Sequence, residues 1–478
     1  MPSHANSTPP EKHDSIDRLE SSWLPYSFRS IAIVIALFAV LIRLAPVMRS
    51  NLDTALIHDD SFWYIQTADG LRHGCGFARL IDGACARAEI MRTPGYPLFL
   101  TMMPSIRWAL AAQAVVGGIV AILVALWIVR SWSVGAALLT EFLVAFDLPS
   151  EVLSNQVMAE ELFQLLLLLV VVPPLLVISR ATKDSRGLTI AALSGLAAAA
   201  AILTRPIAIA VPILMPIPFL FVRSIGRRRF TIAAIACALS AIAPCAWILR
   251  NYEVAGYLGL STSAPINLYY YRAVEVEARR TGTNVTSVKY AFGRKLGVPF
   301  EHIFDANVQS PQLVSRMNRL SSQVIMHAPL QAVLMTILNT VYISTFPTRT
   351  PLADLLGTPG GDIAGSGLSS GNPSLSRFAI EFHKLLQSPV LAMLVAFQAI
   401  LTVVVWIGIF LAMLRCRHAT LEYRVWTIYL MLVSLFMIVL AAGGEADVRF
   451  RVPVVPLFAI VAALGYFPVA RSPVACES

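Results

Sequence analysis

Two adjacent carboxylates, Asp59 and Asp60, follow the first long apolar segment of the chain, which begins at Ile31. A carboxylate that is held ionised beside a substrate can take the proton from a hydroxyl group and act as a general base. The same pair could instead lie in a solvated turn, or cap the helical stretch that follows it. The pair therefore predicts a general-base site, with a purely structural turn as the alternative.

Arginines form a second set of candidates, because each lies near the boundary of an apolar segment: Arg205, Arg250, Arg449 and Arg451. A planar guanidinium donates two parallel hydrogen bonds to a phosphate, which makes arginine well suited to phosphate binding. Long basic side chains at such boundaries can also simply reach toward the polar layer of a membrane. We expect at most two of the four to contact a phosphate, with Arg205 and Arg250 first and Arg451 third.

The composition places these residues in a membrane protein. Apolar residues make up 57% of the 478 residues and charged residues 14%, and the mean hydropathy is +0.69. A soluble domain has roughly 45–50% apolar and about 25% charged residues, so a soluble protein is excluded. The net charge of +9 collects in short basic segments between apolar ones, as in cytoplasmic loops. No aromatic residues alternate with this charge, so we expect no nucleic-acid partner.

Ten apolar segments have about the length that a membrane-spanning helix needs, and no strand pattern is evident. We therefore predict an all-α bundle of ten to twelve transmembrane helices with amphipathic helices in its outer loops. The predicted spans are Ile31–Val47, Trp108–Val129, Val134–Phe146, Leu162–Ile178, Leu188–Leu203, Ile207–Val222, Phe230–Leu249, Pro389–Leu414, Val425–Ala442 and Val452–Phe467. A weaker segment, Leu330–Phe346, would invert every later loop if it crossed once, so it is either re-entrant or followed by a second crossing.

This pattern predicts a polar, disordered cytoplasmic segment, Met1–Arg29, and one transmembrane domain over residues 30–478. Two large loops fall outside: residues 49–107, which carry the candidate base, and residues 250–388, an acceptor-binding or lid region. Within the second loop, Gly357–Gly371 is rich in glycine and serine and is predicted to be mobile. Arg43 lies near the outer end of the first span, and we expect its side chain to reach the membrane surface.

The first outer loop resembles that of a known enzyme superfamily. The string HDDSFWYIQTADGLRHGCGF, followed by RTPGYPLFL, is similar to the first luminal loop of GT-C glycosyltransferases. The closest likeness is to the bacterial family-39 group, which includes protein O-mannosyltransferases and the lipid A aminoarabinose transferase. In that group an Asp is followed by a Tyr four residues later and an Ala four beyond, as Asp60, Tyr64 and Ala68 are here. The resemblance favours Asp60 over Asp59 as the base, although Ser61 replaces the residue usual after the Asp.

Four further regions resemble the superfamily in the same order along the chain. They contain Glu160, Arg205, Arg250, and Glu445 with Arg449 and Arg451. The resemblance implies inverting transfer of a sugar from a polyprenyl-phosphate carrier to a hydroxyl acceptor on a protein, lipid or glycan. It implies a bacterial inner-membrane protein with an extracytoplasmic active site. Residues expected to bind substrate are Tyr64, Arg92, Glu160, Arg205, Arg250, Arg449 and Arg451.

Three alternatives are left open by the sequence. The alternative function is a transporter or flippase of a lipid-linked sugar, which would share the basic outer pocket without needing a carboxylate. We expect no required metal cofactor, although Asp60 and Glu160 could supply two oxygen ligands to a divalent cation. Cys75 and Cys85 lie in one outer loop, where oxidation is permitted, and are either bonded or free.

Overall fold

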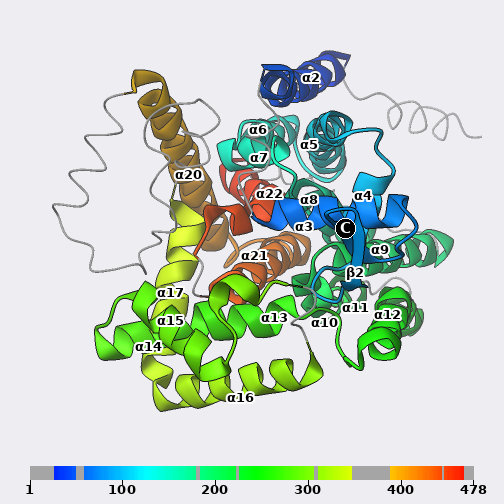
Figure 1. Cartoon of the computed structure of the whole chain (residues 1–478). Helices are drawn as coiled ribbons and strands as arrows, with labels where there is room; N and C mark the ends of the chain where they lie inside the picture. The colour runs from blue at the N-terminus through cyan, green and yellow to red at the C-terminus, as the bar shows by residue number, and fades with distance from the viewer. Residues whose placement is uncertain are drawn as a thin grey trace, which may run out of the picture.

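A computed structural model describes residues 26–49, 59–178, 184–221, 226–305, 310–346, 388–443 and 446–467. Its spanning elements are all helical. Besides helices, the described residues contain one two-stranded sheet (Figure 1). Most of the predicted disordered N-terminus, the glycine-rich segment Gly357–Gly371, and Glu445 lie outside these ranges.

Eight helices of the described chain are long and apolar enough to cross a membrane. They are α2 (Tyr26–Arg49), α5 (Ile106–Ser131), α8 (Glu160–Ile178), α9 (Asp184–Thr204), α12 (Arg228–Ala255), α20 (Pro389–Arg415), α21 (Leu421–Ala441), and α22 (Val455–Tyr466) together with η6 (Val448–Val454). Two shorter apolar stretches complete the ten predicted segments: α6 (Val134–Ala145), and η2 (Pro206–Ala210), α10 (Val211–Leu214) and α11 (Ile217–Leu220) in succession. The chain is a multi-pass, all-helical membrane fold, and the first helix among the described residues begins at Tyr26 rather than after Arg29.

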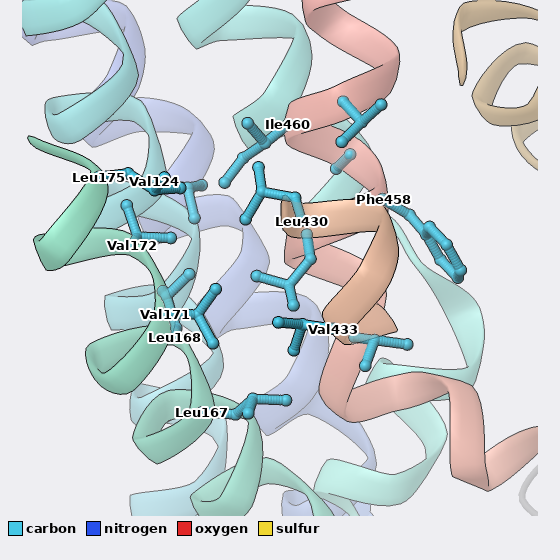
Figure 2. Close-up of a cluster of buried hydrophobic side chains, with 14 of the residues drawn as sticks. Val124, Leu167, Leu168, Val171, Val172, Leu175, Leu430, Val433, Phe458 and Ile460 are labelled. Atoms are coloured by element: carbon cyan, nitrogen blue, oxygen red, sulfur yellow. The ribbon is translucent and has the colours of Figure 1, made fainter. Parts of the chain in front are cut away.

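Branched apolar side chains fill the centre of the bundle. Val124 of α5, Leu168 of α8, Leu430 of α21 and Ile460 of α22 lie together there (Figure 2). The window of α22 is 89% buried, whereas those of α2 and α20 are 28% and 17% buried. The central position therefore belongs to α22, while α2 and α20 lie at the edge of the bundle (Figure 1) and present apolar faces suited to lipid.

Small residues let the helices approach closely, as is usual where hydrophobic exclusion from water cannot drive packing. A Cβ atom added at Gly465 of α22 would lie 1.8 Å from the carbonyl oxygen of Gly408 on α20. Even alanine is therefore too large for this crossing, and the two glycines fix the position of α20 against the central helix.

The two ends of the bundle differ. At one end, Val47, Ala109 and Val157 pack with Tyr64 and Tyr96 of the first loop. At the other end, the ring of Trp132 contacts Tyr423, and Arg415 donates a hydrogen bond to the carbonyl of Gly465. The first loop thus covers one end of the bundle, and the basic residue Arg415 lies at the opposite end.

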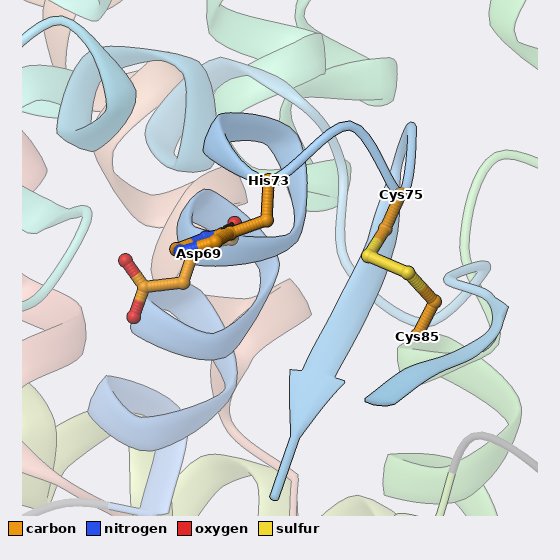
Figure 3. Close-up of a disulfide and its surroundings, with 4 residues drawn as sticks. All are labelled: Asp69, His73, Cys75 and Cys85. Carbon is orange, nitrogen blue, oxygen red and sulfur yellow. Dashed lines mark hydrogen bonds between the residues drawn. A yellow bond between two sulfur atoms is a disulfide. The ribbon is translucent and has the colours of Figure 1, made fainter. Parts of the chain in front are cut away.

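The first loop begins with α3 (Asp59–Arg72) and ends with α4 (Gly95–Thr101), and between them lies an antiparallel hairpin of β1 (Ala78–Ile81) and β2 (Ala84–Ala88). The hairpin is an element that the sequence did not predict beside the helices of this loop. Its turn is Asp82–Gly83, with φ angles of 49° and 78°, the left-handed pair that a tight two-residue hairpin requires. The disulfide Cys75–Cys85 bonds the hairpin, as Figure 3 shows, and decides the alternative left open by the sequence.

The second large loop forms a helical cap with its own core. Its elements are α13 (Ser263–Ile266), the π-helix η4 (Asn267–Ala273), α14 (Val274–Thr281), α15 (Val285–Leu296), η5 (Phe300–His302), α16 (Pro311–His327) and α17 (Pro329–Thr345). Tyr269, Tyr270 and Met317 are buried in this core. The remaining short helix, α7 (Leu148–Ser154), connects α6 to α8.

The weak segment Leu330–Phe346 forms α17, which is bent by 97° from α16. Asn339 donates to the carbonyl of Gly443, just after α21 ends. The carbonyl of Ser344 accepts hydrogen bonds from Arg451 of η6 and Trp406 of α20. These contacts pack α17 against η6, α20 and the end of α21, and the chain that follows it, residues 347–387, lies outside the described ranges.

Candidate active site

A cavity of about 520 Å³ lies between the first loop, the helical cap and the ends of the spans. Six of the nine predicted site residues line it: Asp60, Tyr64, Arg92, Glu160, Arg205 and Arg449. They come from segments up to several hundred residues apart in the sequence, so the fold brings the separate candidates to one place. Among the described lining residues, four arginines and two carboxylates leave a formal excess of two positive charges.

Asp60, the second residue of α3, pairs with two arginines. Nη2 of Arg92 lies 2.5 Å from one of its carboxylate oxygens, and Nη1 of Arg449 lies 3.6 Å from the other. Burial raises the pKa of the Asp60 carboxyl, but attraction from Arg92, Arg449 and Arg205 outweighs it, so the pKa lies below its ordinary value of 3.8. Asp60 is therefore an ionised acceptor of protons at neutral pH. Asp59 is the first residue of the same helix, and its side chain lies outside what the structure describes.

Buried charges in the hairpin position Arg92. Glu89 accepts hydrogen bonds from the backbone N–H groups of Met91, at 2.6 Å, and Arg92, at 3.3 Å. The same carboxylate forms an ion pair with Arg79, and both side chains are almost fully buried. Arg79 also donates to the carbonyl of Phe304 in the helical cap. The hairpin thus fixes the backbone that carries Arg92 and ties it to the opposite wall of the cavity.

Arg92 also lies over aromatic rings. Its guanidinium carbon is 4.7 Å from the ring centroid of Trp63 and 5.2 Å from that of Tyr64. Tyr64 in turn packs edge-on against Tyr96, at 4.8 Å between centroids. These contacts restrict the guanidinium to the plane above the rings, which leaves its edge directed to Asp60.

A second ion pair joins two other segments. Glu160 opens α8, and Arg205 follows the end of α9; Nη1 of Arg205 lies 2.5 Å from the Glu160 carboxylate. The end of α9 is held by the first loop, because Thr93 donates to the carbonyl of Thr204. A Cβ atom at Gly95 would lie only 2.5 Å from the Thr204 hydroxyl oxygen. Glycine in the RTPGYP motif therefore permits the close approach that brings Arg205 to the cavity.

Aromatic side chains form another wall. Trp63 stacks on Phe304, with ring centroids 4.7 Å apart, and Tyr271 also lines the cavity. Exposed faces of such rings are suited to packing against the C–H groups of a sugar or a lipid chain.

Two predicted site residues lie elsewhere. Arg250 donates to the carbonyls of Glu89 and Phe77, and it does not appear among the lining residues of the cavity. Arg451 donates to the carbonyls of Ser344 and Phe346 and lies 3.8 Å from Asp147. The structure therefore gives both arginines packing partners away from the cavity.

The prediction for Arg43 is wrong. Its side chain is 1% exposed, donates to the carbonyl of Ala145 at 3.0 Å and lies 4.0 Å from Glu151. A Cβ atom at Gly117 would lie 2.6 Å from its Nε atom, so that glycine makes room for the guanidinium inside the bundle. Arg43 is buried because α6 and α7 provide acceptors there.

Sequence reasoning missed Arg272, Tyr271 and Asp447. Arg272 and Tyr271 line the cavity from η4, and Asp447 lies 3.5 Å from Nε of Arg449. A run of three tyrosines and an arginine, Tyr269–Arg272, in a loop otherwise read as polar was the available signal.

No group of three or more His, Cys, Asp or Glu residues that could hold a metal ion occurs in the described ranges. Asp60 and Glu160 both line the cavity, and each is paired with an arginine.

No family model matches the chain, and no curated protein matches it. Among solved structures, the chain is similar to the archaeal oligosaccharyltransferase AglB from Archaeoglobus fulgidus, determined in complex with an inhibitory peptide and a dolichol-phosphate. The identity is 12% and the TM-score 0.48, with 91% of this chain and 50% of that chain covered. This chain thus spans about half the length of that protein, and we draw no functional argument from the likeness.

Proposed function

We propose that this protein is an inverting glycosyltransferase that moves a sugar from a polyprenyl-phosphate carrier to a hydroxyl acceptor. The observation that carries the proposal is one carboxylate, Asp60, held ionised beside Arg92 and Arg449 in a cavity with excess positive charge. A base and a nearby set of cations are the two things that this reaction needs from a protein.

The proposed reaction is a single displacement at the anomeric carbon. The acceptor oxygen forms a bond to that carbon while the bond from the carbon to the phosphate oxygen breaks. The bonding electron pair passes to the phosphate, and the acceptor proton passes to Asp60. The phosphate changes from a diester with one negative charge to a monoester with a charge of about −1.5 to −2 at neutral pH. A cavity with excess positive charge stabilises that increase.

The surrounding bundle agrees with a lipid-linked donor. The cavity lies at the end of the spans, and apolar residues such as Ile207, Ile209 and Leu440 line it beside the charged ones. The basic residue Arg415 lies at the other end of the bundle, and basic loops face the cytoplasm as a rule. We therefore propose a multi-pass protein of the bacterial inner membrane with an extracytoplasmic active site.

The alternative proposal is a transporter or flippase of a lipid-linked sugar. Such a protein needs a path through the bilayer, and the core of the bundle is filled by buried apolar side chains such as Leu168 and Leu430 (Figure 2). This packing favours the transferase.

The test is an assay of purified protein in lipid nanodiscs with a polyprenyl-phosphate sugar and a panel of acceptors, following the release of polyprenyl phosphate. Asp60→Asn should lower turnover by about 10²–10⁴-fold, the usual contribution of a positioned base, with unchanged thermal unfolding. Asp69→Asn, an exposed change on the same helix, is the matched control and should be active. Sugar transfer that needs Asp59 but not Asp60 would assign the role of general base to Asp59. Sugar moved across liposomes without any release would favour the flippase.

We also propose that no divalent metal is required. The arginines around the cavity supply the positive charge that a metal ion would otherwise provide. Turnover should survive exhaustive treatment with EDTA, and loss of activity that one divalent cation restores would contradict the proposal.

A further inference from the structure

The arginines that line the cavity differ in how far their charge is already neutralised. Arg92 has a carboxylate partner at 2.5 Å, and Arg205 has another at the same distance. Arg449 lies 3.6 Å from Asp60 and 3.5 Å from Asp447. The positive charge of each of these three guanidinium groups is thus partly neutralised by a carboxylate of the protein.

Arg272 is the exception among them. Its Nη2 atom donates to the hydroxyl oxygen of Thr336 at 2.7 Å, and no ion pair between Arg272 and a carboxylate occurs among the described residues. Burial lowers the pKa of Arg272. Thr336 therefore orients the guanidinium without neutralising it, and the other N–H groups can bind a ligand.

The backbone around Arg272 is also unusual. It belongs to η4, a π-helix over Asn267–Ala273, and such wide turns occur often at functional sites. Tyr269 and Tyr270 on the same turn are fully buried and donate to the carbonyls of Phe292 and Val298. The buried tyrosines hold the turn in place, while Tyr271 and Arg272 face the cavity.

We propose that Arg272 binds the phosphate of the polyprenyl-phosphate donor. This inference rests on the proposed function and names the residue that recognises the charged part of its substrate. A phosphate attracts most strongly the cation that has no carboxylate beside it, and the planar guanidinium can donate two parallel hydrogen bonds to its oxygens. In this arrangement Arg92 and Arg449 keep Asp60 ionised, while Arg272 holds the leaving group.

The experiment measures binding of a short-chain polyprenyl phosphate to the full-length protein in nanodiscs, and compares it with binding of the uncharged polyprenol. Wild type should prefer the phosphate, and Arg272→Gln should lose about tenfold or more of that preference. Arg272→Lys keeps the charge but cannot donate two parallel hydrogen bonds, so it should lose less of the preference for the phosphate. Arg280→Gln, which removes a more exposed arginine from the neighbouring helix α14, is the matched control. Asp60→Asn should retain the preference.

The possible outcomes separate the two proposals. A wild-type protein that binds phosphate and alcohol equally would contradict the polyprenyl-phosphate donor itself. A wild-type preference that Arg272→Gln and Arg272→Lys both keep would overturn the assignment of Arg272 and leave the donor class standing. If Arg272→Gln does not fold, as judged by thermal unfolding, the assignment of Arg272 is decided by whether Arg272→Lys keeps the preference for the phosphate. Competition by inorganic phosphate at the same concentration as the lipid would show a free-phosphate site and would also overturn the assignment.

Discussion

As the proposed general base, Asp60 combines two opposing properties. Its carboxylate is ionised because Arg92, Arg449 and Arg205 more than offset the cost of burial, yet the same arginines lower its affinity for a proton. A base of this kind works when the proton is lost by the acceptor at the moment that its bond to the sugar forms. Its value lies in its position and constant ionisation rather than in strong basicity.

The pH dependence of the reaction should report this arrangement. On the proposed chemistry the active form of Asp60 is the carboxylate, and its lowered pKa should place the loss of activity on acidification below the ordinary range of an aspartate. Arg92 is the largest of the charges that lower this pKa, so Arg92→Gln should move the acid limb of the profile to higher pH. The measurement is the pH dependence of kcat/KM for wild type and variant.

The position of the limb, rather than the size of the rate, is the decisive quantity, because Arg92→Gln also removes a positioning contact. Arg72→Gln, which changes an arginine of α3 that pairs with Asp69, serves as the control and should leave the limb in place. An acid limb that does not move in Arg92→Gln would mean that another group limits the reaction at low pH.

Among the elements, the hairpin β1–β2 supports the site although no residue of its two strands lines the cavity. The side chains of both Arg79 and Glu89 are buried in their ion pair, and Glu89 accepts hydrogen bonds from the backbone of Met91 and Arg92. Removing one partner of a buried pair leaves an uncompensated charge, which costs about 3–5 kcal/mol.

Glu89→Gln should therefore lower the midpoint of thermal unfolding and reduce turnover. Arg79→Met combined with Glu89→Gln should recover much of the stability, because no charge is left buried without a partner. Glu277→Gln, which breaks a more exposed pair with Arg280, should leave both quantities nearly unchanged. Equal effects of Glu89→Gln and Glu277→Gln would refute the positioning role of the hairpin.

The sequence predicted the spans well and the hairpin not at all. Apolar runs of sufficient length report crossing of a bilayer directly, and all ten predicted segments have helical counterparts. The strand Ala84–Ala88 has no β-branched or aromatic residue, and Ile81 is the one such residue in Ala78–Ile81, so the composition that favours strands is nearly missing. The Asp82–Gly83 dipeptide between them was the only local signal of its turn.

The sequence placed several candidate residues at the ends of apolar segments, but it could not show where each side chain points. Arg205 and Arg250 carry the same sequence signal, an arginine at the end of an apolar segment. Arg205 faces the cavity, whereas Arg250 turns to the carbonyls of Phe77 and Glu89. The difference depends on acceptors supplied by the hairpin, which local sequence cannot reveal.

At the scale of the whole molecule, the orientation in the membrane can be tested independently of activity. Thr283, after α14, is exposed on the helical cap, and His418 is exposed beyond the end of α20. In a background without the other unpaired cysteines, Thr283→Cys should react with a membrane-impermeant maleimide in intact spheroplasts. His418→Cys should react only after the membrane is permeabilised. The reverse pattern would place the cavity in the cytoplasm.

The excess of positive charge in the cavity has a kinetic consequence. On the proposed chemistry, the lipid product carries more negative charge than the donor, so a site tuned to the transition state also holds its product more tightly than its substrate. Dissociation of the spent carrier, rather than sugar transfer, then sets the rate at saturating donor. The enzyme would work fastest where a downstream reaction removes the free carrier, and its output would follow the rate at which the membrane recycles that lipid.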